Sequence, residues 1–133
     1  MSRVNLPLLA AGLSGASAVA LGAYGYHGLA ADEAARDVFM IGVQYQAWHA
    51  LALLVTAWLA ETRRGAWRRG ALAAAAAFVV GTVLFCGSLY VFAATGDLPL
   101  AGAAPAGGFV LFAGWLMLAA VAFGGHGGDP SKH

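Results

Sequence analysis

Four long runs of uncharged, mostly apolar residues divide the chain. They contain no Asp, Glu, Lys or Arg, each is at least 23 residues long, and they cover residues 4–31, 38–60, 70–96 and 98–128. A helix needs about 20 mainly apolar residues to cross the hydrocarbon core of a bilayer. The pattern therefore predicts an all-α membrane protein, a four-transmembrane-helix bundle with spans at about 6–27, 39–60, 71–94 and 106–123.

Capping and charged residues mark the limits of the first two spans. Asn5 is placed to cap the first helix, and Pro7 stands near its first position, where a missing N–H costs little. Residues 30–38 predict a short interfacial turn before the second span. Within it, Asp32 and Arg36 are four residues apart, a spacing that favours a helical ion pair.

The remaining connections and the two ends of the chain complete the domain description. Residues 61–70 predict a tight basic loop, and residues 95–105 predict a loop with Gly and Pro. The Ala-Ser-Ala triplet at 16–18 resembles a signal-peptide cleavage site, but the apolar run is longer than the 7–15 residues of a signal peptide, so we expect a retained span. We expect one membrane domain, residues 1–125, and a flexible cytoplasmic tail, residues 126–133.

Composition agrees with a lipid environment. The chain is 61% hydrophobic and 10% charged, whereas about a quarter of the residues of a soluble domain are charged; its mean hydropathy is +0.75. A net charge of +1 is too small to indicate a nucleic-acid partner. The expected partners are the lipid bilayer and, within it, other membrane subunits or further copies of the chain.

The basic residues predict the orientation. Cytoplasmic segments of membrane proteins are enriched in Lys and Arg. If the loop at 61–70 is cytoplasmic, four spans place both the N and the C terminus in the cytoplasm. Six of the seven basic residues then lie inside, and four of the six acidic residues lie outside. We expect a multi-pass protein of the bacterial inner membrane.

Small residues recur at helical spacing and predict helix contacts. Without a hydrophobic drive between helices in lipid, association depends on close packing of small side chains. The alternative is chance, because the chain has 19 glycines. The seams predict a compact bundle with little central space; their candidate residues are Ala11, Gly15, Ala18, Gly22 and Gly25 in the first span and Gly81 and Ser88 in the third.

A polar cluster interrupts the second span. Tyr45, His49 and Thr56 fall within a narrow arc of this helix, with Gln46 at its edge. Polar side chains at membrane depth need partners, so the arc is expected to face the bundle interior. Two interpretations stay open: a proton path or ligand site, or an interhelical hydrogen-bond clamp. The clamp partners would come from Ser14, Ser17, Thr82, Ser88 and Tyr90, and the opposite, lipid-facing side would carry Ala47, Ala50, Leu51, Leu54 and Trp58.

The sequence gives no support for a cofactor or a catalytic residue. Haem ligation requires two His at similar depth on facing helices, but His27 and His126 lie at opposite ends of their spans and His49 lies in the middle. Carboxylates are absent from the spans, which argues against a metal site. Cys86 and Ser88 lack a neighbouring base and are assigned to packing. Trp115 is assigned either to packing or to the interfacial belt.

The chain resembles the YgdD-like family, the domain-of-unknown-function family 423, also called the transmembrane protein 256 family. The matching segments touch all four spans, and one difference is Cys86, where the family pattern has Ser. The resemblance implies a small multi-span membrane protein without an established activity. The segments are Gly22–Leu29, Gly42–Leu54, Phe85–Tyr90 and Pro105–Trp115, of which Gln-Tyr-Gln-x-x-His at 44–49 is the most specific.

Three functions remain in competition. The first is a non-catalytic accessory or assembly subunit of a larger membrane complex, indicated by the small size and the packing seams. The second is a small transporter or proton-linked carrier that uses Tyr45, Gln46 and His49. The third is a quinone- or lipid-binding redox accessory protein with Tyr45, Trp48 and His49 at its site. Of the three, we expect the accessory or assembly subunit.

Overall fold

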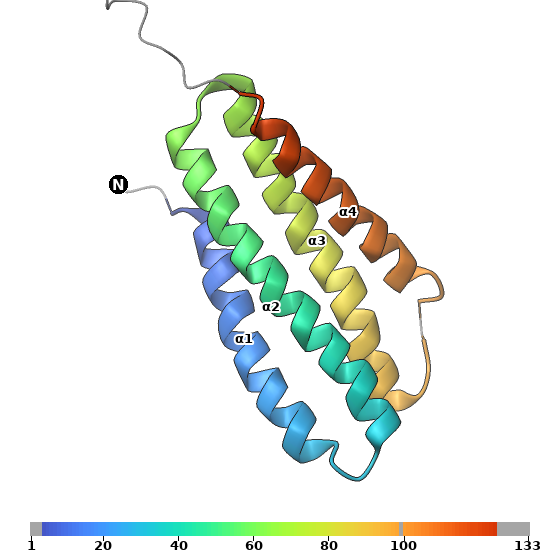
Figure 1. Ribbon diagram of the computed structural model, residues 1–133. Helices are drawn as coiled ribbons and strands as arrows, with labels where there is room; N and C mark the ends of the chain where they lie inside the picture. Colours follow the sequence, from blue (N-terminus) through green and yellow to red (C-terminus); the bar gives the residue numbers. More distant parts are fainter. Residues whose placement is uncertain (1–3, 99, 125–133) are drawn as a thin grey trace, which may run out of the picture.

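The computed structural model describes residues 4–98 and 100–124, which are helical apart from short connections (Figure 1). All four helices are long and apolar enough to cross a membrane, which confirms the predicted fold class. The predicted tail at 126–133 lies outside the described residues. The helices are α1 (Leu6–Gly28), α2 (Glu33–Thr62), α3 (Gly65–Thr95) and α4 (Ala103–Val121).

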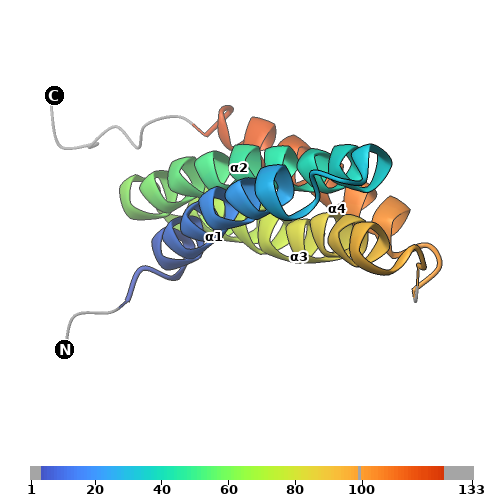
Figure 2. The same ribbon diagram turned by 90° about the horizontal axis from the view of Figure 1, so that it is seen from below.

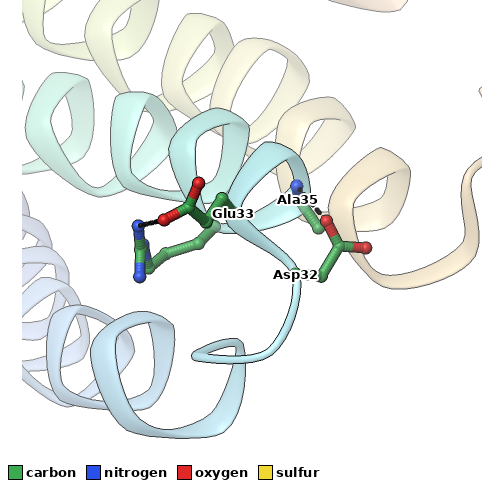
Figure 3. Close-up of polar contacts among 4 residues, drawn as sticks. Asp32, Glu33 and Ala35 are labelled. Carbon is green, nitrogen blue, oxygen red and sulfur yellow. Dashed lines mark hydrogen bonds and ion pairs between the residues drawn. The ribbon is translucent and has the colours of Figure 1, made fainter.

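Side-chain caps fix the starts of the first two helices. The Asn5 side chain accepts a hydrogen bond from the Leu8 amide at 3.1 Å, as predicted. At the second helix, the Asp32 carboxylate accepts from the Ala35 amide at 2.9 Å (Figure 3). A capped first turn satisfies amides that have no partner within the helix. As a result, α2 begins directly after Asp32 and not at residue 39.

The predicted Asp32–Arg36 ion pair is wrong. Arg36 pairs with Glu33 instead, at 3.7 Å between Nη2 and Oε1 (Figure 3). Asp32 stands outside the helix with extended backbone angles, φ −124° and ψ 94°, and its carboxylate is occupied by the cap. The i,i+4 geometry that brings helical side chains together therefore does not apply to it.

The predicted basic loop at 61–70 is also mostly helical. Only Arg63 and Arg64 connect α2 to α3, and the chain turns at Gly65, whose φ of +58° suits glycine. The Arg68 Nε donates to the Ala60 carbonyl at 3.1 Å, which satisfies an acceptor at the end of α2. Charged residues mark the expected boundary of the hydrocarbon core, whereas helical hydrogen bonding continues beyond it.

The helices of this four-helix bundle lie side by side in chain order (Figure 1). α3 packs extensively against both α2 and α4, whereas α1 packs on α2 and touches α3 only lightly. Figure 2 shows α1 and α3 on the same side of α2. Both described ends of the chain lie at the same end of the bundle as the α2–α3 connection (Figure 1). Their cytoplasmic placement stays a prediction.

Glycines allow α3 and α4 to approach closely. A Cβ at Gly107 would lie 2.5 Å from the Phe85 backbone nitrogen, and one at Gly81 would lie 2.7 Å from the Leu111 side chain. Such contacts favour helix association in lipid because they increase van der Waals packing. The main core cluster draws on all four helices and consists of Ala11, Ala52, Leu53, Ala74, Ala75, Phe78 and Leu111.

We expect Gly107→Ala to destabilise the bundle by about 1–3 kcal/mol, because overpacking forces backbone or side-chain shifts. The matched control is Gly87→Ala in α3, where nothing lies within 4 Å of the added Cβ. The measurement is the free energy of unfolding in mixed micelles, followed by circular dichroism against denaturing detergent. Equal stability of the two variants would contradict the close α3–α4 contact.

Candidate functional site

Gln46 of α2 connects three helices through its side-chain amide. Its Nε2 donates to the Ser14 carbonyl at 3.0 Å and to the Ser17 Oγ at 2.7 Å, both on α1. Its Oε1 accepts from the Tyr90 hydroxyl of α3 at 2.8 Å. Gly42, one turn before Gln46, leaves room for this tyrosine, because a Cβ there would lie 2.7 Å from the Tyr90 ring. The amide is thus fully paired inside the protein.

His49 forms a second connection, from α2 to α4. It is 4% exposed, and its Nδ1 lies 2.7 Å from the Tyr45 carbonyl oxygen. The Trp115 indole Nε1 donates to its Nε2 at 3.1 Å. A carbonyl only accepts and an indole N–H only donates, so this arrangement requires a neutral ring with its proton on Nδ1. Both ring nitrogens are then occupied by hydrogen bonds within the protein.

The other two candidate residues do not join these connections. Tyr45 contributes its carbonyl to His49, while its ring packs against Phe85 with centroids 4.8 Å apart. The Thr56 hydroxyl is buried and donates to the Leu53 carbonyl of its own helix at 2.8 Å. The predicted cluster is therefore two separate hydrogen-bonded groups, centred on Gln46 and His49.

Three of the five proposed clamp partners bind Gln46, and two do not. The Ser88 hydroxyl donates to the Leu84 carbonyl within α3 at 2.6 Å. The Thr82 Oγ1 is buried and makes no hydrogen bond among the described residues. It lines a groove of about 620 Å³ between α1 and α3, to which Gln46 also contributes.

The lipid-facing side of α2 agrees with the sequence pattern except at one residue. Leu51, Leu54 and Trp58 are exposed, but Ala50 is buried and its assignment to lipid is wrong. At 100° per residue, Ala50 lies about 40° from Gln46 around the helix. Because α2 packs against both α1 and α3, the buried arc is wide enough to include it.

The small residues of α1 contact α2 unevenly. Gly22 lies beside α2, since a Cβ there would be 3.4 Å from Val43, whereas Gly15 has nothing within 4 Å. Gly81, the candidate in α3, is buried against Leu111 of α4. Of the five small residues predicted to form a seam on α1, the three that are seven apart are buried, namely Ala11, Ala18 and Gly25.

Sequence reasoning missed the role of Trp115. A tryptophan in the middle of a span needs an acceptor for its N–H, because lipid supplies none. Trp115 lies well inside α4, and His49 lies near the middle of α2. This similar depth is the signal that could have connected them.

Metal-ligating side chains are dispersed over residues 4–98 and 100–124. No group of three His, Cys, Asp or Glu side chains within these ranges could hold a metal ion. Cys86 is buried and free, and it lines the groove between α1 and α3. His126, considered above as a haem ligand, lies outside the described residues.

We expect Gln46→Leu to lower the free energy of unfolding by about 2 kcal/mol, since it removes three hydrogen bonds of about 0.6 kcal/mol each. The matched control is Gln44→Leu, because Gln44 is exposed two residues earlier on the same helix. Unfolding in denaturing detergent, followed by tryptophan fluorescence, measures the difference. A Gln46→Leu variant as stable as the control would show that the amide does not hold the helices together.

Comparison with known proteins identifies relatives over most of the chain. The family model described as "Protein of unknown function (DUF423)" matches residues 21–108. The UPF0382 membrane protein YwdK of Bacillus subtilis is 38% identical over 108 residues, which cover 79% of this chain and 85% of the relative. No solved structure is significantly similar to the chain.

Two further relatives come from other bacteria. The UPF0382 inner membrane protein YgdD of Escherichia coli K12 is 37% identical over 113 residues, 84% of each chain. A UPF0382 membrane protein of Haemophilus influenzae is 34% identical over 117 residues, 86% of this chain and 91% of the relative. Together with the four spanning helices, these relatives confirm the family resemblance and the predicted location in a bacterial inner membrane.

Proposed function

The chain belongs to the DUF423 family of membrane proteins, and we propose that it is a non-catalytic accessory or assembly subunit of a larger membrane complex. The family description names no activity, so the proposal depends on the contacts that the helices make and leave open. Its partner is a transmembrane helix of another protein, bound along the α2–α4 face.

One observation carries the proposal: the Trp48 indole N–H has no hydrogen-bond acceptor among the residues that the structure describes. Trp48 lies near the middle of α2 and is 50% exposed, and its Nε1 makes no hydrogen bond within the part of the chain described. A tryptophan that faces lipid is favoured near the membrane interface, where its N–H meets water. At mid-span, an unpaired N–H is costly unless a neighbouring helix supplies an acceptor.

A groove beside Trp48 supplies space for such a helix. Its volume is about 400 Å³, and it lies between α2 and α4. Trp48 and Trp115 lie on its two sides, and aromatic side chains of this size dominate many protein interfaces. A carbonyl or hydroxyl on the incoming helix would accept the hydrogen bond from Trp48. The remaining lining residues are apolar: Leu51, Ala52, Val55 and Leu118.

The same contacts count against a proton-linked carrier. A proton relay needs a group that can release one hydrogen bond and form another along a path. Gln46 and both nitrogens of His49 are occupied by neighbouring helices or by the α2 backbone. Transport through these groups would require the helices to separate, whereas a structural role requires no movement.

The quinone-binding alternative has weaker geometric support. It needs Tyr45, Trp48 and His49 to line one site, but the groove beside them includes only Trp48 of the three. His49 is buried behind its contact with Trp115, and the Tyr45 ring packs on Phe85.

We expect the native protein, extracted in mild detergent, to migrate in an assembly that contains another membrane protein. Trp48→Phe keeps the ring but removes the N–H, and should make that assembly dissociate at a lower detergent concentration. The matched control is Trp58→Phe, because Trp58 is exposed on the same helix but lies outside the groove. Native gel electrophoresis with mass spectrometry of the bands gives the composition and the dissociation point.

Three outcomes would contradict the accessory role. The protein could isolate alone from native membranes under every mild condition. It could co-purify only with further copies of itself, as a differently tagged second copy would reveal. Alternatively, the two tryptophan variants could weaken the assembly equally, which would remove the specific role of the Trp48 N–H.

A further inference from the structure

A second groove, which shares no lining residue with the α2–α4 groove, runs between α1 and α3. It exists because α1 packs on α2 and only touches α3. The half near the α2–α3 connection has a volume of about 530 Å³ and adjoins the 620 Å³ groove that extends toward Tyr90. Its lining side chains are apolar and include Leu6, Leu9 and Leu13 of α1 and Leu72, Ala76 and Val79 of α3.

The length of this apolar half matches the chains of one bilayer leaflet. From Leu72 to Val80 the α3 helix rises about 12 Å at 1.5 Å per residue. Half of the hydrocarbon core is about 15 Å thick. This half of the groove is therefore long enough for most of an acyl chain from the leaflet at the α2–α3 end.

Arg69 lies on the groove-lining face of α3, one turn before Leu72, the first α3 residue that lines the groove. It lies three residues before Leu72 and seven before Ala76, so all three lie on one face of α3. Arg64, at the start of α3, is exposed at the same end. Among the described residues, neither arginine makes an ion pair or a side-chain hydrogen bond.

The neighbouring charged groups leave this end positive. Arg63 donates to the Gly124 carbonyl at 2.8 Å, and Arg68 donates to the Ala60 carbonyl, so both keep their charge. Glu61 accepts from the Asn5 side chain at 3.2 Å and forms no ion pair with a described arginine. An apolar groove that opens at a positively charged end of the protein complements an amphiphile with an anionic head.

We propose that the α1–α3 groove holds an anionic phospholipid, with its phosphate bound by Arg69 and an acyl chain along Leu72, Ala76 and Val79. A guanidinium group can bind phosphate oxygens through paired N–H donors. In a bilayer such a lipid already has its head at the surface and its chains in the core, so the groove needs no further contacts to orient it. This site is independent of the accessory role.

The experiment uses the full-length protein in nanodiscs of phosphatidylcholine with added phosphatidylglycerol. Native mass spectrometry after release into detergent counts the lipids retained by each protein. We expect phosphatidylglycerol to be retained in preference to phosphatidylcholine. Arg69→Gln should weaken this preference about fivefold, the effect of one basic residue near a membrane surface. The control is Arg36→Gln, at the opposite end of the bundle, where the arginine pairs with Glu33.

A second pair of variants tests the groove itself. Ala76→Phe fills the groove and should reduce retention of both lipids, because it displaces the acyl chain. Ala73→Phe adds the same ring to an exposed position of α3 outside the groove, and should leave retention unchanged. Circular dichroism checks that each variant remains helical.

Five results would overturn the proposal. They are equal retention of the two lipids by the wild type, an equal effect of Arg69→Gln and Arg36→Gln, and an equal effect of Ala76→Phe and Ala73→Phe. The fourth is complete displacement of phosphatidylglycerol by inorganic phosphate, which would show a headgroup site without a bound chain. A protein mass in place of lipid masses would also overturn it, because the groove would then bind a helix.

Discussion

Lipid offers no hydrogen-bond partner to a side chain in the middle of a membrane span, and the arrangement of these helices follows from that constraint. Gln46 can lie inside α2 because α1 and α3 supply a carbonyl, a hydroxyl donor and a hydroxyl acceptor. His49 can lie there because its own helix and Trp115 supply one partner for each ring nitrogen. The polar groups thereby fix which helices meet and at what depth, while small residues set how closely they approach.

The same constraint applies to the surfaces that the packed helices leave uncovered. α3 is the central helix, and α1 and α4 attach to different sides of the α2–α3 pair. Two grooves result. One lies beside the Trp48 N–H, which has no acceptor in residues 4–98 and 100–124, and the other is lined by the α3 face that carries Arg69. Each presents a chemical need that lipid chains alone do not meet: an acceptor at mid-span in the first case, and an anion at the membrane surface in the second.

Much of the fold could be predicted from the sequence, because charged residues are excluded from the hydrocarbon core and so delimit the spans. The Asn5 cap and the inward position of Gln46 follow from equally local rules. The helical segments 33–38 and 65–70 could not be predicted in this way, since charge marks the expected membrane boundary and not the end of helical hydrogen bonding. For the His49–Trp115 bond, the sequence offers only the similar depth of the two residues and does not fix their contact. That contact depends on the register of α4 against α3, which is set by close contacts at Gly81 and Gly107; the spacing of small residues within one helix does not say which residues of the other helix they meet.

The most direct test of the pairing of polar groups in the membrane is the protonation state of the His49 ring. Nitrogen-15 solid-state NMR on the histidine-labelled protein in lipid bilayers distinguishes the two neutral tautomers from the cation, and His49→Gln identifies the signal. We expect a neutral ring with its proton on Nδ1 and an Nε2 signal that shifts in Trp115→Phe. A proton on Nε2, or an Nε2 signal that Trp115→Phe does not move, would contradict the account.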